Sequence, residues 1–128
     1  MYGTRVTSTR PFDEVLAAAR TALADQGFGI VSEIDMAATL RAKLGVVTPR
    51  ITILGACHPG FAHEALQAEP SIGLLLPCNV VVREAEEGTL VEAVDPRMMV
   101  DVTANEDLAP IAQDVGRGLR SALGTLGS

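Results

Sequence analysis

The stretch that decides the fold runs Leu74-Leu75-Leu76-Pro77-Cys78-Asn79-Val80-Val81-Val82-Arg83-Glu84, then Ala85-Glu86-Glu87-Gly88, then Thr89-Leu90-Val91-Glu92-Ala93-Val94. Its apolar and β-branched run is the strongest strand signal in the chain. Glu86-Glu87-Gly88 is typical of a tight turn, so residues 74–84 and 89–94 are predicted to form adjacent antiparallel strands. Pro77 cannot donate a ladder hydrogen bond, and we therefore expect a bulge or an unpaired edge there, with the strand bent.

Upstream, two strands and two helices are predicted. Residues 2–9 favour a short strand, and Pro11 begins a helix that Gly27 ends. Its apolar residues recur at helical spacing: Phe12, Val15, Leu16, Ala19, Ala22 and Leu23. Residues 28–34 alternate as a strand with one face on the core. Asp35 is the expected N-cap of a short helix over residues 36–44, which Gly45 closes.

The remaining elements follow from similar signals. Residues 51–56 are predicted to be a strand, and Pro59 begins a brief helix that ends before Pro70. Residues 98–102 are expected to add one more short strand. Asn105 is the expected cap of a final helix whose apolar face holds Leu108, Ile111, Ala112, Val115, Leu119 and Leu123.

This order of elements predicts an α+β fold for residues 1–128 as a single domain. Because the late strands are consecutive and hairpin-like, an antiparallel sheet with two long helices on one face and short extra helices is favoured over a doubly wound parallel sheet. A sheet with one bare face often associates with a second copy. We therefore expect a homodimer.

Composition narrows the class of protein. The formal net charge is −6 and the Lys and Arg residues form no run, which argues against nucleic acid as a partner. The longest apolar runs are far shorter than the roughly 20 residues that cross a bilayer, so no membrane span is expected. The N-terminus shows no signal-peptide pattern, which predicts a cytoplasmic location with both cysteines as thiols.

Two motifs resemble a known family. Ile53-Leu54-Gly55-Ala56-Cys57-His58-Pro59 and Gly73-Leu74-Leu75-Leu76-Pro77-Cys78-Asn79-Val80-Val81-Val82 are similar to the bacterial and archaeal domain of unknown function 302. Further matching positions are Phe12-Asp13, Gly27-Phe28, Thr39-Leu40, Lys43-Leu44-Gly45, Asp95-Pro96 and Met98. The resemblance implies a β-α-β4-α core like that of TATA-binding-protein-type domains, usually as a homodimer, and no assigned function. Where that family usually has Asn, this chain has His58.

The residues that could carry function surround the two cysteines. Cys57 directly precedes a predicted helix start, where the helix dipole lowers a thiol pKa, and His58 could reinforce that effect. Cys78 follows Pro77, where unpaired backbone could admit a ligand. Each cysteine could equally be a small packing residue. The candidate ligand-binding residues are Cys57, His58, Pro59, Pro77, Cys78 and Asn79.

Three functions stay open at this point. The leading hypothesis is a non-enzymatic, homodimeric binding or accessory domain with a small-molecule or metal ligand. The alternatives are a thiol redox enzyme, which needs the Cα atoms of Cys57 and Cys78 within about 7 Å, and a purely structural dimer. Met98 or Met99 could join the cysteines and His58 on Cu(I) or Zn, but the spacing matches no standard metal pattern. No metal, cofactor or catalytic residue is assigned.

Overall fold

The computed structural model describes residues 2–127. In chain order, its first half contains β1 (Gly3–Ser8), α1 (Phe12–Asp25), β2 (Gly29–Asp35), α2 (Met36–Leu44), β3 (Ile51–Cys57) and α3 (Pro59–Ala68). Its second half contains the 3₁₀ helix η1 (Pro70–Leu75), β4 (Cys78–Ala85), β5 (Gly88–Val94), α4 (Arg97–Thr103), the 3₁₀ helix η2 (Glu106–Leu108) and α5 (Ala109–Gly124).

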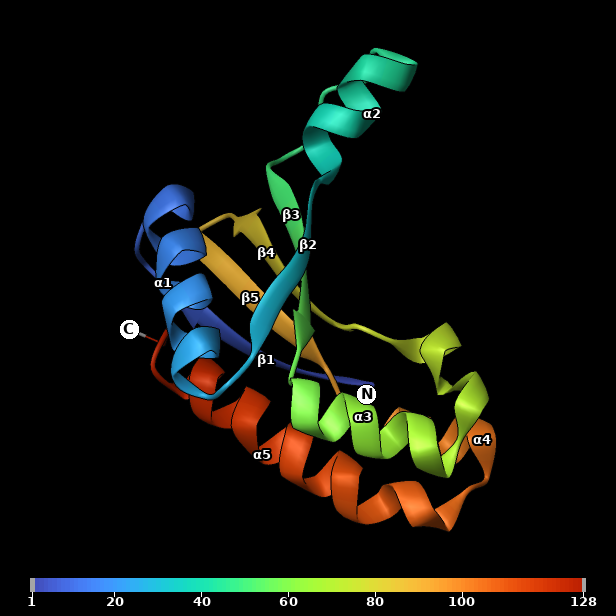
Figure 1. The fold of residues 1–128 in the computed structure, drawn as a ribbon. Helices are drawn as coiled ribbons and strands as arrows, with labels where there is room; N and C mark the ends of the chain where they lie inside the picture. Colours follow the sequence, from blue (N-terminus) through green and yellow to red (C-terminus); the bar gives the residue numbers. More distant parts are fainter. Residues whose placement is uncertain (1, 128) are drawn as a thin grey trace.

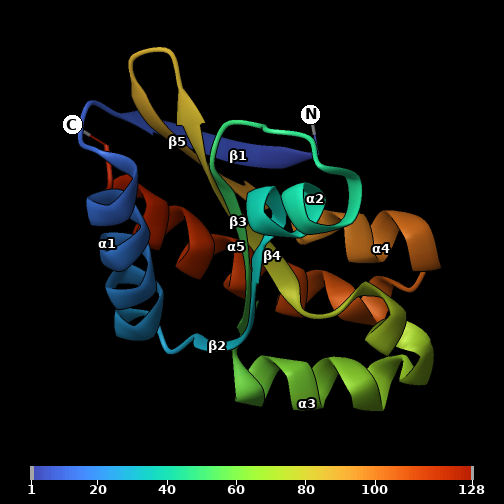
Figure 2. The same ribbon diagram turned by 90° about the horizontal axis from the view of Figure 1, so that it is seen from above.

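The strands form one five-stranded antiparallel sheet in the order β1-β5-β4-β3-β2. The two long helices, α1 and α5, pack on the same face of this sheet and on each other (Figures 1 and 2). The predicted α+β class, the antiparallel sheet and the placement of the long helices are therefore confirmed. Within the described part of the chain, every helix is too short or too polar to traverse a lipid bilayer.

The core lies between the sheet and these two helices. Side chains on alternate positions of β3, β4 and β5 point into it, and Leu54, Val80 and Val91 are fully buried. They pack in one cluster with Val15 of α1 and Leu119 of α5. Because this cluster is almost wholly aliphatic, the fold is stabilised mainly by removal of apolar surface from water, at about 25 cal/mol per Å².

The expected long strand over residues 74–84 is wrong in its first part. Leu74 and Leu75 belong to η1, and β4 begins at Cys78. Pro77 therefore precedes the strand, and β4 is an inner strand, so neither the predicted bulge nor the predicted unpaired edge occurs at that residue. The physical reason is that Ile72, which lies within η1, is completely buried in the core, and this burial holds residues 70–75 as a 3₁₀ helix.

The expected strand over residues 98–102 is also wrong, because Arg97–Thr103 form α4. The side chain of Asp95 accepts a hydrogen bond from the backbone N–H of Arg97 at 3.0 Å and starts the turn. The hydroxyl of Thr103 donates to the carbonyl of Met99 one helical turn back. Asn105 caps η2 by accepting from the N–H of Asp107, and the long final helix starts after η2.

The other helix signals behave as predicted. The carboxylate of Asp35 accepts from the N–H of Ala38 at 2.9 Å, and Gly45 closes α2 with φ of 69°, in the left-handed region. β2, however, does not place one face on the core as expected. It is an edge strand with a bulge between Ile30 and Ser32, and most of its residues are exposed.

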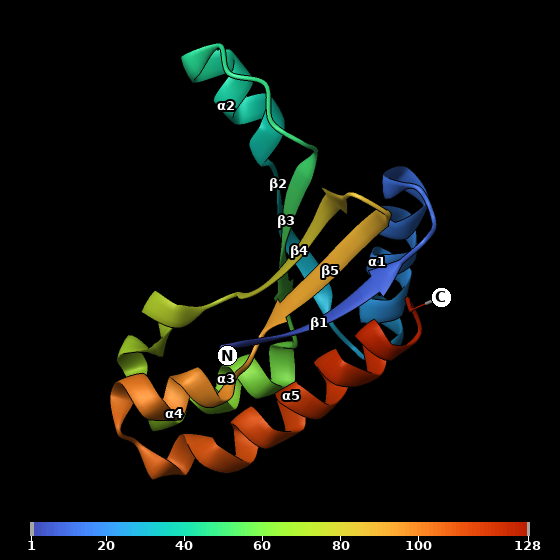
Figure 3. The same cartoon turned by 180° about the vertical axis from the view of Figure 1, so that it is seen from behind.

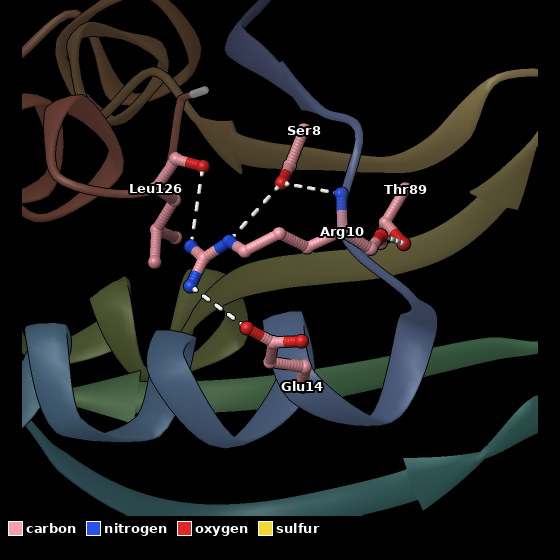
Figure 4. A network of polar contacts seen from close by, with 5 residues as sticks. All are labelled: Ser8, Arg10, Glu14, Thr89 and Leu126. Carbon is pink, nitrogen blue, oxygen red and sulfur yellow. Dashed lines mark hydrogen bonds and ion pairs between the residues drawn. The ribbon is translucent and has the colours of Figure 1, made fainter.

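Arg10 joins the two ends of the chain at one corner of the sheet (Figure 4). Its guanidinium contacts the hydroxyl of Ser8, the carbonyl of Leu126 and the carboxylate of Glu14, at 3.4 to 3.6 Å. Its own carbonyl accepts a hydrogen bond from the hydroxyl of Thr89 at 2.9 Å. These contacts fix the connection from β1 to α1 against β5 and the end of α5.

Candidate functional site

The two cysteine-containing motifs meet where β3 ends and β4 begins. The strands are antiparallel neighbours, and Ala56 lies opposite Cys78. Cys57 is one position beyond this pair, and His58 then serves as the N-cap residue of α3. Both cysteines are free thiols, with Cys57 half-buried and Cys78 buried.

A small cavity of about 20 Å³ lies at this junction. Cys57, His58 and Cys78 line it together with Met99 of α4. Its other lining residues are Phe28, Ala56, Phe61, Ala62, Ala65, Leu76, Pro77, Ile111 and Val115. The space is close to the volume that one water molecule needs. Because nearly all of the wall is apolar, the cavity offers few hydrogen bonds to such a water.

His58 is the polar side chain in this wall. Its ring stacks edge-on against Phe28, with centroids 5.6 Å apart, and lies 4.3 Å from the ring centroid of Phe61. Its Nδ1 is buried and has no hydrogen-bonding partner among the described residues. Gly27, with φ of 86°, leaves room for the imidazole, because a Cβ there would come within 2.9 Å of Nε2. A buried ring nitrogen of this kind is open to one atom of a bound molecule.

Cys78 is uncharged at neutral pH. Burial raises the pKa of its thiol to about 11, and the nearby Cys57 adds a smaller effect in the same direction. Since the thiolate is the nucleophile and the metal ligand, Cys78 in this state is a poor group for either role.

A larger groove of about 330 Å³ lies on the other side of Cys78. η1 and the start of β4 form one wall, while the end of β5 and the start of α4 form the other. Its lining residues are Leu74, Leu75, Leu76, Pro77, Cys78, Asn79, Val94, Asp95, Pro96, Met98 and Met99. Leu76, Pro77, Cys78 and Met99 also line the small cavity, so the cavity and the groove share a wall.

The one carboxylate in the groove wall, Asp95, is already paired. Arg97 donates three side-chain hydrogen bonds to its two oxygens, at 2.6 to 3.2 Å. These bonds hold the pKa of Asp95 below its ordinary value. The charge therefore stays at the rim of the groove and is compensated there.

The six candidate residues from the sequence are distributed unequally around these spaces. Cys57 and His58 line the cavity, Pro77 and Cys78 line both spaces, and Asn79 lines the groove. Pro59 is exposed at the start of α3 and lines neither. Within residues 2–127, no group of three or more His, Cys, Asp or Glu side chains is placed to hold a metal ion.

Sequence reasoning missed the apolar residues that complete the site. Phe28 lies just before β2, Phe61 lies on α3, and Ile111 and Val115 both lie on α5, so these residues meet at the cavity only through packing. Met99 was considered as a possible metal ligand, whereas its buried side chain forms part of the wall between cavity and groove. No local signal in the sequence marks these five as neighbours.

Comparison with known proteins agrees with this architecture. A solved structure titled "Crystal structure of uncharacterized conserved protein DUF302 from Bacillus stearothermophilus" superposes with a TM-score of 0.91 at 25% identity, and covers 97% of each chain. An uncharacterized protein of Aquifex aeolicus (strain VF5) is 24% identical over 80 residues, which span 62% of this chain but about half (49%) of that relative. The family model described as "Domain of unknown function DUF302" matches residues 4–126. The chain therefore belongs to the DUF302 family.

Proposed function

We propose that this domain is a non-enzymatic binding module for a small, uncharged and mainly apolar molecule. The ligand would lie in the groove between η1 and α4, above Cys78. The observation that carries this proposal is the combination of a groove of about 330 Å³ with a wall made mostly of Leu, Met, Pro and Val side chains. That volume is at the lower end of the range for small-molecule sites.

Charge selects against ionic ligands. The thiol of Cys78 is neutral, because burial raises its pKa to about 11, and Asp95 is compensated by Arg97. An ion would lose its hydration in the groove without gaining a free partner of opposite charge. An apolar molecule would instead gain the free energy of removing its surface from water.

Two features of the groove would allow it to fit a ligand closely. Met98 and Met99 are flexible and polarizable, so their side chains can adapt to an irregular shape. The amide of Asn79 provides a neutral hydrogen-bonding group at the edge. Behind the wall, the free Nδ1 of His58 lines the cavity, so a ligand that displaced the side chains of Leu76 or Met99 could reach a polar atom.

A thiol redox enzyme is less well supported. That function would use Cys57 as nucleophile and Cys78 as the resolving thiol, yet Cys78 is buried and its pKa is raised. Attack on a disulfide requires the thiolate form. The geometry therefore favours binding over thiol chemistry.

The experiment is a fluorescence titration with the neutral apolar probe N-phenyl-1-naphthylamine. We expect a saturable increase in emission with the wild-type protein. Leu75→Glu places a carboxylate in the groove wall and should weaken the binding about tenfold or more. Leu66→Glu is the matched control, because Leu66 is exposed to a similar extent (42% against 37%) but lies on α3, away from the groove.

Two results would overturn the proposal. One is a wild-type protein that gives no saturable signal up to the solubility limit of the probe. The other is equal binding by Leu75→Glu and Leu66→Glu, which would place the probe elsewhere. Circular dichroism of both variants establishes that each is folded before the comparison is made.

A further inference from the structure

A projecting arm of this molecule contains no buried residue. It consists of residues 36–49, which are α2 and the connection to β3. All nine residues of α2 keep contact with solvent, and the helix extends beyond the end of the sheet (Figures 1 and 3). Its exposed aliphatic side chains are Leu44, Val46 and Val47, at 69%, 43% and 84% exposure. An apolar cluster this exposed is typical of an interaction surface.

The arm differs in charge from the rest of the chain. It carries Arg41 and Lys43 and no carboxylate, a formal charge of +2, which leaves −8 on the other residues of a chain with a total of −6. The basic side chains and the exposed aliphatic ones lie within seven consecutive residues, 41–47. A matching surface must therefore be both acidic and partly apolar.

A surface of that kind occurs at the opposite end of the same sheet. Residues 95–107, which span α4 and η2, hold four carboxylates and one Arg, a formal charge of −3. Asp101, Glu106 and Asp107 are exposed, and so is the aliphatic side chain of Val102, at 63%. We call this the α4 surface.

The arm and the α4 surface of one molecule do not meet. α2 joins β2 to β3 at one end of the sheet, whereas α4 follows β5 at the other end (Figures 1 and 3). The face of the sheet turned away from α1 and α5 lies between them (Figure 3). If a second copy faced this side of the sheet and were related to the first by a two-fold axis, each arm would lie toward the α4 surface of the other copy. Such a contact is made twice, because two-fold interfaces are reciprocal.

We propose that the arm docks on the α4 surface of a second copy of this chain, in a two-fold dimer held by reciprocal charge complementarity and apolar contact. Contact between the two arms themselves is disfavoured, because both carry positive charge. Docking on nucleic acid or an anionic membrane is disfavoured by the −8 carried by the rest of each molecule.

The test is a charge swap followed by analytical ultracentrifugation and light scattering. Wild-type protein should be a dimer whose dissociation constant rises with salt. The arm variant Arg41→Glu/Lys43→Glu and the α4-surface variant Asp101→Lys/Glu106→Lys should each dissociate at least about tenfold more readily. Mixed together, the two variants should form a heterodimer, because both contacts then pair opposite charges. Arg117→Glu, an exposed change on α5, is the matched control and should leave the dimer intact.

Three results would overturn the proposal. The first is a wild-type chain that stays monomeric up to roughly 1 mM. The second is a wild-type dimer that both charge-reversed variants retain, or a mixture of the two that forms no heterodimer. The third is a monomer whose arm instead binds a DNA duplex or phosphatidylserine vesicles, with loss of that binding in Arg41→Glu/Lys43→Glu. The affected side chains are exposed, so both variants are expected to fold.

Discussion

Two glycines in α5 provide a sharp test of how the site is packed. Gly116 and Gly118 lie two positions apart in the same helix, and replacing either by Ala gains about 1 kcal/mol of helix propensity. Their surroundings differ. A Cβ at Gly118 would come within 2.9 Å of Cε2 and 3.3 Å of Cζ of Phe28. A Cβ at Gly116 would meet the far end of Arg120, at 3.0 Å from an Nη atom, and Pro96 at an ordinary 3.7 Å.

The two neighbours respond differently to an added methyl group. Arg120 is long and flexible, so its guanidinium can move aside. Phe28 is buried, packs against His58 and lines the cavity, so its ring cannot move without disturbing the site. Overpacking of a core of this kind costs about 1 to 3 kcal/mol. We expect Gly116→Ala to raise the free energy of unfolding by about 1 kcal/mol. The free energy of unfolding of Gly118→Ala should be about 1 to 3 kcal/mol lower than that of Gly116→Ala.

Urea unfolding followed by circular dichroism measures both free energies, and in thermal unfolding the midpoint temperatures of the two variants should differ by at least roughly 4 °C in a domain of this size. Since helix propensity is common to both variants, the difference isolates the contact with Phe28. Phe28→Leu should relieve it, so that Gly118→Ala in that background becomes as favourable as Gly116→Ala. Equal stabilisation by the two Ala variants in the wild-type background would refute the packing described for this wall.

Three further outcomes are expected. Asn105→Ala removes the cap of η2 and two donated hydrogen bonds, to the carbonyl of Ala68 at 3.0 Å and the carboxylate of Glu69 at 2.9 Å. It should lower the free energy of unfolding, measured in urea, by about 1 to 3 kcal/mol. A loss of less than about 0.5 kcal/mol would contradict that role. Gly55→Ala should destabilise the protein by about 1 to 3 kcal/mol, because its Cβ would collide with the hydroxyl of Ser32 and come within 2.7 Å of Cγ of Pro77. An unchanged urea midpoint would disprove this close packing. The pKa of Cys78 is higher in the folded chain than in the unfolded one, so its contribution to stability is complete below about pH 8.5 and is lost as the pH rises through about 11. This loss should be absent when the free energy of unfolding of Cys78→Ala is measured over the same pH range. Identical pH profiles for the two proteins would show that the thiol is not buried as described.

The sequence predicted the helices with clear end signals and failed where an apolar run was short. Asp35 and Gly45 bracket α2 as expected, because an N-cap side chain and a left-handed C-terminal residue are local features. Leu74 and Leu75 were assigned to a strand because a continuous apolar run does not distinguish strand from helix. The burial of Ile72, which is set by tertiary packing, decides the conformation there. The same ambiguity misassigned residues 98–102, where the side chain of Asp95 starts a helix.

The sequence indicated the residues that the ends of β3 and β4 contribute to the candidate site, but not those that α4 and α5 contribute. The sequence grouped the two cysteine motifs in one candidate site on the condition that their strands are neighbours, and the structure does place Ala56 opposite Cys78. Met99 and Val115 follow from no pattern near the cysteines, because they reach the cavity from helices that begin after the sheet is complete. Their contribution depends on how α4 and α5 pack, which is a property of the whole core.

The position of Cys78 explains why this junction suits binding better than reaction. As the first residue of an inner strand, it lies opposite Ala56 of β3, and its side chain lies on the core face with Val80 and Val82. That burial is what raises its pKa, so the feature that keeps the groove floor apolar also keeps the sulfur protonated. Moving the sulfur toward solvent would restore its reactivity and would also remove the apolar floor that an uncharged ligand requires.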